Sequence, residues 1–446
     1  MSDAAIIRAI ADCNPNEALQ PDDRRFVNFD DLRGFALRKR VVKLLQSAET
    51  VQQFAKVTVV GHRGSGKSTE LNRAQQELTA QGYVTLWASV NENLDPRDIS
   101  FSDVMRLLVL LLDDRFGEQS NQCPPVREAF DVVAQWFREV TKEFEERINS
   151  ARQFGMRGRA GGGASAELSG GLAKFKTDLG EISAALSVVR QSDNTESTRV
   201  REKLESYNST LVENVNILLR AVRQNLCGDD KLVFILDNVD KYEPSIVNQA
   251  FLMHADLFHQ LDAHLIFTLQ SSLLYTPVDS AADQSFKTET LPMLPVFLSR
   301  SREVNPRLLD RVREAVYLRV PCELFTDGDA VVNRLIEASG GCWRDLLRLL
   351  VEALLSAEGT IREADGLKAR QLVAQTYRRL IREEDLRALA ETHFSHAVLS
   401  GDTTRYLLHH LCLLYYNGEG WYDIHPLLDS YPPVQDAIAA RRIVAQ

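Results

Sequence analysis

The sequence predicts an α/β fold in which helices cover a parallel sheet and a mainly helical region follows it. Three observations support this prediction. A short apolar stretch at 56–60 leads into a glycine-rich loop at 61–68 and then into a helical pattern at 69–78. A second apolar stretch, 231–237, ends in a carboxylate. Around these landmarks, further strand-like stretches and stretches of helical periodicity follow along the chain.

The glycine-rich loop reads G-x-x-x-x-G-K-S from Gly61 to Ser68, a P-loop motif. Its glycines let backbone N–H groups wrap phosphate oxygens, and the helix start that follows adds positive potential. Lys67 is expected to reach the β- and γ-phosphates, and the Ser68 hydroxyl to hold Mg²⁺. A chance glycine-rich turn is the alternative, and the flanking strand and helix, which ends near Gly82, argue against it. The predicted nucleotide contacts from this stretch are Gly61, Arg63, Gly64, Ser65, Gly66, Lys67, Ser68 and Thr69.

Composition limits the class of protein. The 446 residues suggest two to four domains, and 44% hydrophobic residues are enough for real cores. The net charge of −10 argues against a chain built chiefly to coat nucleic acid. The six cysteines form no C-x-x-C pair, which excludes a zinc site by spacing and favours free thiols. No signal-peptide pattern or long apolar run is present, so we expect a cytoplasmic protein without membrane contact.

The first part of the chain prepares the loop. Residues 1–50 form a lead-in, with a turn at 28–34 before a helix that carries apolar residues from Leu37 to Leu45. This helix either covers a bound base or simply packs on the core. After the loop helix we expect a second strand at 82–90.

A long helical insertion is expected at about 100–228. Helical spacing is clear at 102–112, 126–148 and 200–222. Residues 152–163 are rich in Gly and Arg, and Arg152, Arg157 and Arg159 could contact nucleic-acid phosphates. We favour a solvated loop there. The pattern at 164–187 fits an amphipathic helix or a hairpin.

Asp237 ends the apolar strand 231–237, the Walker B pattern, and is expected to hold a magnesium-bound water beside Ser68. The next apolar strand, 264–270, has a polar end where Thr268 or Gln270 would sit beside the γ-phosphate as a sensor. A fifth strand is expected at 291–297, and its two prolines would confine it to an edge.

The remainder reads as helices and a hairpin. Helices are expected from 306 to 355, from 367 to about 396 and from 403 to 414. Arg344 opens a helix after a glycine turn, where it would reach back to the nucleotide; the alternative is a surface or carboxylate-paired arginine. Residues 415–423 surround an Asn-Gly pair and predict a hairpin, so the C-terminal region resembles a winged helix. The expected domains are a lead-in at 1–50, an ATPase-type core at 51–300, a helical lid at 301–360 and a C-terminal domain at 361–446.

Four blocks, 61–69, 232–241, 264–273 and 339–350, resemble the AAA+/STAND group of P-loop ATPases. With the run ending Leu291-Pro292-Met293, the chain is similar to uncharacterised bacterial ATP-binding proteins of this group. The resemblance implies ATP and Mg²⁺ as ligands, a lead-in over the adenine ring, and a helical lid. It also implies that the Asp237 strand lies beside the loop strand. By position it makes Lys67 and Ser68 the phosphate and Mg²⁺ residues, Asp237 the Walker B acid, and Arg344 the lid arginine called sensor two.

One departure concerns hydrolysis. AAA+ motors usually carry a glutamate directly after the Walker B aspartate, and this chain has Asn238 there. The next acid is Asp240, followed by Lys241, a spacing closer to the STAND signalling ATPases. Hydrolysis is therefore expected to be slow, or Asp240 orients the water. The catalytic residues of this hypothesis are Lys67, Asp237 and Asp240.

The first functional hypothesis is a regulatory ATPase whose nucleotide state switches its shape or assembly. Its partner would be a protein effector encoded nearby, as in bacterial defence or signalling, and a homo-oligomer stays open. The second hypothesis is a DNA-bound AAA+ ATPase resembling origin-recognition or transposition helpers. The arginines near 157 and the winged-helix pattern favour it, and the net charge does not. A third hypothesis is a scaffold that binds ATP without hydrolysing it.

Overall fold

The computed structural model describes residues 3–95, 99–155, 207–228, 231–275, 286–298, 302–416 and 420–444. The predicted loop at 152–163 lies outside these residues from position 156 onward, as does the whole pattern at 164–187. The tip of the C-terminal hairpin, 417–419, also lies outside them.

The fold is α/β, with a five-stranded parallel sheet of order β2-β3-β4-β1-β5. Its strands are β1 (Lys56–Val60), β2 (Val84–Ser89), β3 (Leu232–Asp237), β4 (His264–Leu269) and β5 (Lys287–Thr290). β1, β3 and β4 are buried along their whole length, as apolar runs in a sheet covered on both faces should be. The predicted strands at 56–60, 82–90, 231–237 and 264–270 are thus confirmed.

Two expectations about the sheet are wrong. β4 lies between β3 and β1, so the Asp237 strand is not beside the loop strand. Every parallel connection is a crossover, so neighbours along the chain need not be neighbours in the sheet. The edge strand next to β1 is 287–290 rather than 291–297. Leu291 still donates to Val60 O at 2.7 Å, but Pro292 and Pro295 have no N–H with which to extend the ladder.

The chain divides into two compact units. The P-loop unit comprises residues 1–47, 57–77 and 267–446, and the insertion unit comprises 48–56 and 78–266. β5 and nearly all of β1 belong to the P-loop unit, and β2 and β3 belong to the insertion unit.

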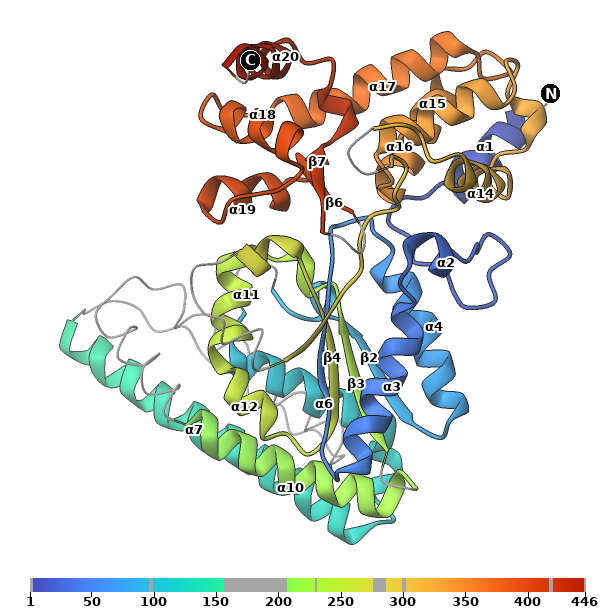
Figure 1. The fold of residues 1–446 in the computed structure, drawn as a ribbon. Coiled ribbons are helices and arrows are strands. Elements are labelled where there is room, and N and C mark those ends of the chain that lie inside the picture. The colour runs from blue at the N-terminus through green and yellow to red at the C-terminus, as the bar shows by residue number, and fades with distance from the viewer. Residues whose placement is uncertain are drawn as a thin grey trace. The chain divides into compact units, whose positions relative to one another are not determined.

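The described residues of the insertion expected at about 100–228 are mainly helical, and they belong to the insertion unit. α7 (Pro124–Gly155) and α10 (Asn208–Leu226) pack along each other (Figure 1). The predicted apolar spacing of α10 is confirmed, because Leu211, Val215, Leu218 and Val222 are fully buried. The described helices of the insertion unit that follow β2 are α5 (Val90–Asn93), α6 (Phe101–Ser120), α7 (Pro124–Gly155), α10 (Asn208–Leu226), η1 (Val239–Lys241), α11 (Pro244–Ala250), η2 (Leu252–His254) and α12 (Ala255–His259).

The P-loop unit starts with a lead-in and ends with a long helical region. The lead-in holds α1 (Asp3–Asp12), α2 (Asp30–Arg33) and most of α3 (Leu37–Thr50), and α4 (Lys67–Ala80) follows the loop. After β4 come η3 (Ser271–Tyr275), α14 (Pro306–Tyr317), η4 (Cys322–Leu324), α15 (Asp329–Ser339), α16 (Trp343–Ser356), α17 (Glu363–Arg378), α18 (Asp385–Ser395), α19 (Asp402–His409), β6 (Leu413–Tyr415), β7 (Tyr422–Ile424), η5 (Pro426–Leu428) and α20 (Pro432–Val444).

The C-terminal hairpin is confirmed, with β6 and β7 antiparallel. Two helix predictions need correction. The helix expected at 367–396 is two helices, α17 and α18. The helix expected at 403–414 ends at His409, since Leu411 has a φ of +59° and the chain then enters β6.

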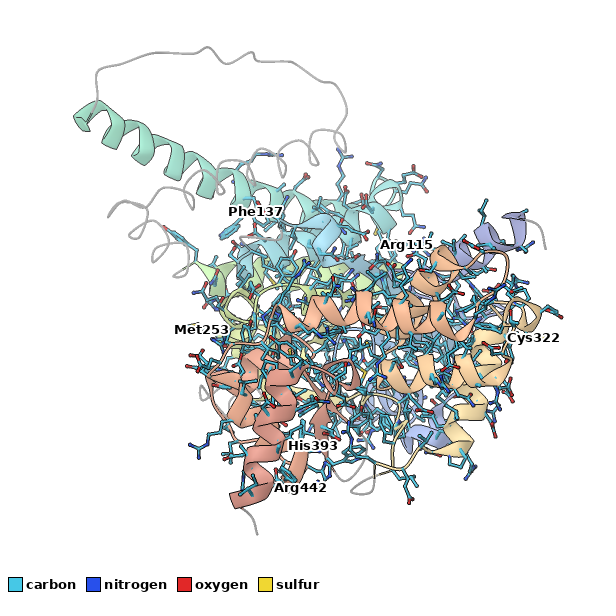
Figure 2. The ribbon with its side chains drawn as sticks, turned by 90° about the horizontal axis from the view of Figure 1, so that it is seen from above. Arg115, Phe137, Met253, Cys322, His393 and Arg442 are labelled. Atoms are coloured by element: carbon cyan, nitrogen blue, oxygen red, sulfur yellow. The ribbon has the colours of Figure 1, made fainter. Side chains whose placement is uncertain are left out.

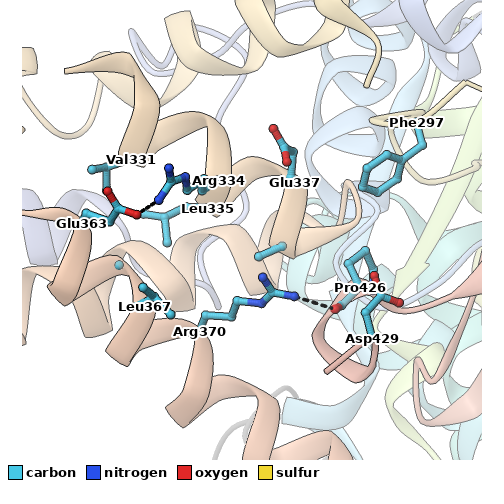
Figure 3. A pocket seen from close by; sticks show the side chains of 12 residues that line it. Phe297, Val331, Arg334, Leu335, Glu337, Glu363, Leu367, Arg370, Pro426 and Asp429 are labelled. Carbon is cyan, nitrogen blue, oxygen red and sulfur yellow. Dashed lines mark hydrogen bonds and ion pairs between the residues drawn. The ribbon is translucent and has the colours of Figure 1, made fainter. Parts of the chain in front are cut away.

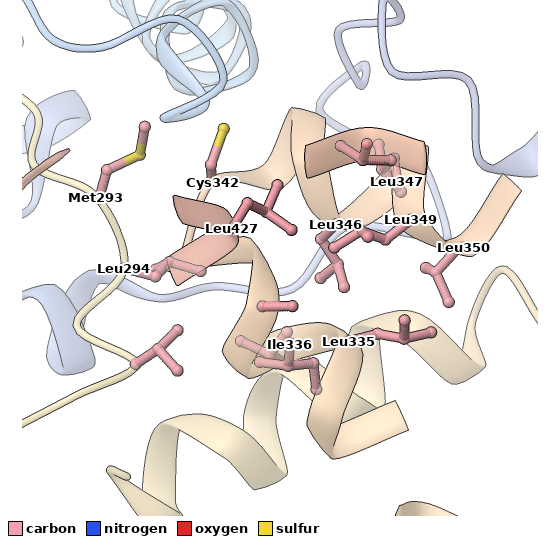
Figure 4. Close-up of a cluster of buried hydrophobic side chains, with 14 of the residues drawn as sticks. Met293, Leu294, Leu335, Ile336, Cys342, Leu346, Leu347, Leu349, Leu350 and Leu427 are labelled. Atoms are coloured by element: carbon pink, nitrogen blue, oxygen red, sulfur yellow. The ribbon is translucent and has the colours of Figure 1, made fainter. Parts of the chain in front are cut away.

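One apolar core joins the helical region to the connector after β5. Leu346, Leu349 and Leu350 of α16 pack with Leu335 and Ile336 of α15 in this core, as Figure 4 shows. Met293, Leu294 and Leu427 belong to the same cluster, so segments from 293 to 428 share one apolar core within the unit.

All six cysteines are free thiols, four of them buried. Cys322 of the P-loop unit and Met253 of the insertion unit are exposed (Figure 2), and the exposed fraction of Met253 is 68%. Within the part of the chain that the structure describes, no helix has the length and apolarity needed to cross a bilayer.

Candidate nucleotide-binding site

The P-loop joins β1 to α4 through a backbone turn that only glycine fits well at several positions. Gly64 and Gly66 have φ values of +84° and +98°, which side chains rarely adopt. A Cβ on Gly61 would lie 2.6 Å from the carbonyl oxygen of Leu291. The first N–H groups of α4 have no acceptor inside the helix. The loop therefore has the backbone geometry of an anion-binding turn.

Lys67 is buried at the base of this loop, with 5% of its surface exposed. Its Nζ donates to the carbonyl oxygens of Gly61 at 2.8 Å and His62 at 2.9 Å. These bonds keep the ammonium group inside the turn of the loop. Ser65 is fully buried, and its Oγ has no hydrogen-bond partner among the described residues. A buried hydroxyl of this kind fits a loop that receives a polar ligand.

The N-terminus of α16 packs directly on the loop. The N–H of Trp343 donates to Gly64 O at 2.9 Å, and the Cys342 thiol donates to Arg63 O at 3.6 Å. A Cβ on Gly64 would lie 2.8 Å from the Cβ of Arg344. The structure thus places Arg344 beside the P-loop. Its Nε is buried and has no hydrogen-bond partner among the described residues.

The lead-in contributes a residue that sequence reasoning missed. Arg33 has 4% of its surface exposed, and its Nη2 donates to Ser65 O at 2.6 Å. Burial lowers the pKa of Arg33, while Glu70 and Asp30 oppose that shift. No pattern in the sequence marks this arginine, because one arginine in a turn resembles any other.

The lead-in makes two further contacts, one with α16 and one with α4. The ring of Phe29 lies 5.4 Å from that of Trp343, centroid to centroid. Thr69, predicted to contact nucleotide, accepts a hydrogen bond from the N–H of Leu19 at 3.2 Å. The hydroxyl of Thr69 therefore holds the lead-in in this structure.

The tip of β4 carries the predicted sensors. Thr268 is fully buried and Gln270 is 3% exposed. The Gln270 Oε1 accepts a hydrogen bond from Nδ1 of His409 in α19. Burial, together with the charge of Arg63, lowers the pKa of His409 to about 4, so this histidine is neutral. The contact between Gln270 and α19 has no counterpart in the sequence prediction.

The Walker B strand belongs to the insertion unit. Asp237 ends β3 with 3% of its surface exposed, and Asp240 follows in η1 with 6% exposed. Asn238 has a φ of +63°, and its Nδ2 donates to Ser89 Oγ at 2.8 Å. The amide of Asn238 is therefore used to tie η1 to the end of β2. Ser68 lies in the P-loop unit, so its pairing with Asp237 at one metal ion stays a prediction.

A buried polar network lies next to Arg344. Asp345 Oδ2 accepts hydrogen bonds from Tyr377 Oη at 2.5 Å and His425 Nε2 at 3.1 Å. Burial would raise the pKa of Asp345, but these bonds and Arg348 outweigh it and lower that pKa. His425 Nδ1 accepts the N–H of Leu427 at 3.1 Å, so Nε2 is the nitrogen that donates to Asp345. The network links the first turn of α16 to α17 and η5.

A cavity of about 260 Å³ in the P-loop unit lies away from the loop (Figure 3). It is bounded by α15, α17 and η5, and no P-loop residue lines it. Arg334 pairs with Glu363 at one end, and Arg370 reaches the carbonyl oxygen of Pro426 at 3.4 Å.

Comparisons with known proteins give matches among solved structures alone. No family model matches the chain, and no curated protein does. The ORC2 protein of Aeropyrum pernix, solved in ADPNP–ADP complexes, is similar with a TM-score of 0.42 and 12% identity, covering 97% of this chain and 98% of that one. A Walker-type ATPase of Pyrococcus abyssi gives a TM-score of 0.42 and 12% identity, covering 96% and 100%. The Aeropyrum pernix ORC1 protein in complex with DNA gives 0.38 and 12%, covering 98% and 97%.

Proposed function

We propose that this chain is a P-loop ATPase that binds ATP with Mg²⁺ and uses its nucleotide state as a conformational or assembly switch. The observation that carries the proposal is the contact between the loop and the start of α16, where Trp343 is bonded to Gly64 and Arg344 is adjacent. A change in the phosphates that the loop holds would alter the loop backbone, and α16 is hydrogen-bonded to that backbone and would move with it.

The chemistry of the residues fits this ligand. Lys67 and the N–H groups of the loop would bind the phosphates, and the guanidinium of Arg344 would make bidentate contacts with them. The Ser68 hydroxyl and the Asp237 carboxylate are hard oxygen donors, the kind that Mg²⁺ prefers. The metal ion would neutralise charge on the phosphate oxygens.

Turnover is expected to be slow. Asn238 is not a proton acceptor, and its amide is already bonded to Ser89. Asp240 would orient the attacking water. If neither residue serves, the chain is a scaffold that binds ATP without hydrolysing it, and a steady-state phosphate-release assay separates the two cases.

The switch would act on a protein effector encoded nearby, in bacterial defence or signalling, or on other copies of the chain. The second candidate function is a DNA-bound AAA+ ATPase. The antiparallel hairpin of β6 and β7 in a C-terminal region of helices favours it, because a winged helix has this arrangement. DNA binding that weakens steeply with added salt would support that candidate.

The test of ATP binding is Lys67→Ala. The parent should be stabilised by ATP–Mg²⁺ in thermal unfolding, by about 2.7 kcal/mol at a hundredfold excess over Kd. Lys67→Ala should lose that shift, because it removes the charge that meets the β- and γ-phosphates. Lys43→Ala, an exposed position of α3, is the matched control and should keep it. A full ATP shift in Lys67→Ala would contradict the proposal.

A further inference from the structure

His62 lies inside the P-loop and its side chain is almost fully buried, with 1% exposed. Both ring nitrogens are bonded within the P-loop unit. The N–H of Tyr415 in β6 donates to Nε2 at 2.9 Å, and Nδ1 lies 3.0 Å from Ser271 Oγ. The side chain thus joins the loop to the C-terminal hairpin on one side and to η3 on the other.

The hydrogen bonds fix the form of this histidine. A backbone N–H can only donate, so Nε2 of His62 must be the acceptor and the proton of the neutral ring sits on Nδ1. Burial, with the charge of Lys67 nearby, lowers the pKa of His62 to about 3, so the ring is neutral near pH 7. His62 therefore presents an acceptor to Tyr415 and a donor to Ser271.

The hairpin uses its outer edge for these contacts. The N–H of Tyr415 goes to His62, and its carbonyl oxygen accepts the N–H of Met293 at 3.0 Å. The neighbouring Tyr416 donates instead to Trp421 O inside the hairpin, at 2.9 Å. Tyr415 stays opposite Tyr422 of β7 in the hairpin, while its own N–H and carbonyl oxygen bond to the body that carries the P-loop.

A second contact comes from the same segment. His409, six residues before Tyr415, donates to Gln270 at the tip of β4. The stretch from α19 to β6 therefore holds both the first turn of the P-loop and the predicted sensor position.

We propose that His62 is a positioning residue that makes the C-terminal hairpin part of the nucleotide site, because the hairpin holds the P-loop in its binding conformation through the Tyr415 N–H. The inference rests on the proposed function and adds to it a route by which the C-terminal region and ATP affect each other. By linkage, whatever displaces the hairpin weakens ATP binding, and ATP binding strengthens the hold on the hairpin.

Two substitutions separate the two bonds of His62. His62→Gln carries a polar atom where Nε2 stood, so it can still accept from Tyr415. His62→Asn carries one where Nδ1 stood, so it keeps the Ser271 side and loses the hairpin. We expect His62→Asn to weaken ATP binding by about fivefold or more, within the usual range of coupling between sites. His62→Gln should stay within about twofold of the parent.

Hydrogen exchange supplies the readout that a general loss of stability would not give. In His62→Asn the amide of Tyr415 should exchange faster while that of Tyr416 keeps its protection, because the latter is bonded inside the hairpin. In the parent, ATP–Mg²⁺ should slow exchange at Tyr415 more than at Tyr416. This measurement on the unsubstituted protein also decides the question if His62→Asn does not fold.

The outcomes distinguish the two proposals. If the parent shows no ATP binding, the proposed function fails and this inference falls with it. If the parent binds ATP but His62→Asn and His62→Gln bind it equally well, or ATP leaves exchange at Tyr415 unchanged, the inference alone is overturned. Tighter ATP binding by His62→Asn would also overturn it, because the hairpin would then oppose the binding conformation.

Discussion

Trp343 donates its backbone N–H to the carbonyl oxygen of Gly64 at 2.9 Å, so a main-chain hydrogen bond joins the first residue of α16 to the middle of the P-loop. The residues are far apart in the sequence, yet the contact leaves no room for a side chain on the loop. A Cβ on Gly64 would lie 2.7 Å from Cys342 Sγ. A movement of the loop backbone would therefore either carry the start of α16 with it or break this hydrogen bond.

Gly64→Ala tests this contact. The substitution adds a clash with Cys342 and Arg344 to the strain of a φ of +84°. We expect the free energy of unfolding to fall by about 2–4 kcal/mol and the ATP shift to shrink. Gly82→Ala is the matched control, since Gly82 has a φ of +87° and open space where its Cβ would be. It should cost only the backbone strain, about 1 kcal/mol. Equal losses in chemical denaturation would contradict the packing argument.

Arg344→Lys tests the lid. A lysine keeps the charge but cannot make the bidentate contacts of a guanidinium with phosphate. The variant should fold normally and show a smaller difference between its ATP- and ADP-bound forms, measured by hydrogen exchange over 306–355. Arg348→Lys is the control one turn later, where the guanidinium bonds Asp345 and Thr376 instead. An ATP-dependent protection pattern that survives in Arg344→Lys would remove this residue from the switch.

Asp240→Asn tests hydrolysis. Asp240 is a buried acid just past the end of β3. The amide of an asparagine in its place cannot accept a proton. Turnover should fall by about 10²-fold, while ATP affinity stays nearly intact, the pattern of an interaction made in the transition state. Glu243→Gln changes an exposed acid three residues later and should leave phosphate release unchanged. Equal turnover in Asp240→Asn and the parent would assign the water to another residue.

Acid should weaken the insertion unit through His264. Burial, with Lys56, Arg223 and Lys231 nearby, lowers the pKa of His264 to about 3. Glu49 Oε1, 3.5 Å from Nε2 of His264, acts against that shift. The unfolded chain titrates near 6.5, so between these values it binds one proton more than the folded chain. The contribution of His264 to the free energy of unfolding is therefore fully present above pH 6.5. It decreases as the pH falls, and about 2 kcal/mol of it is lost at pH 5.

His264→Asn isolates this titration. Nδ1 of His264 accepts the N–H of Ala55 at 2.9 Å, and an asparagine oxygen can take that place without titrating. The pH dependence of urea unfolding should be shallower in the variant by about one proton. His62 and His409, also neutral in the fold, would still contribute some slope. An unchanged slope would mean that His264 is protonated in the folded state.

Short-range patterns predicted the elements well. The P-loop, α4, the strands ending at Asp237 and Leu269 and the C-terminal hairpin each carry their signal within a few residues, because apolar runs, glycines and turn residues act locally. The helix that starts beside Arg344 was also predicted, from the glycine turn before it. The role of Arg344 remains a prediction.

The contacts that hold the site were beyond the sequence. The hydrogen-bond partners of Arg33, His62 and His409 are far away in the sequence and are brought close only by the fold. The pattern of apolar residues in a single sequence predicts which residues are buried, but not which residues contact each other. The sheet order failed for the same reason, since crossovers leave strand neighbours open. The edge strand at 287–290 was missed because its residues alternate charge and threonine, with Lys287 exposed, and show no apolar run.

The bond between Tyr415 and His62 spans 353 residues, and this separation governs how the protein is made. At about 5–20 residues per second, the ribosome finishes the hairpin roughly 20–70 s after it has added the P-loop. During that interval the loop exists without the hairpin, and for most of it also without Trp343. A nascent chain, or a fragment cut after the last strand of the sheet, would carry both Walker sequences and still lack the segments that shape them. Chaperone dependence and low yield are therefore expected for truncations that look complete by motif alone.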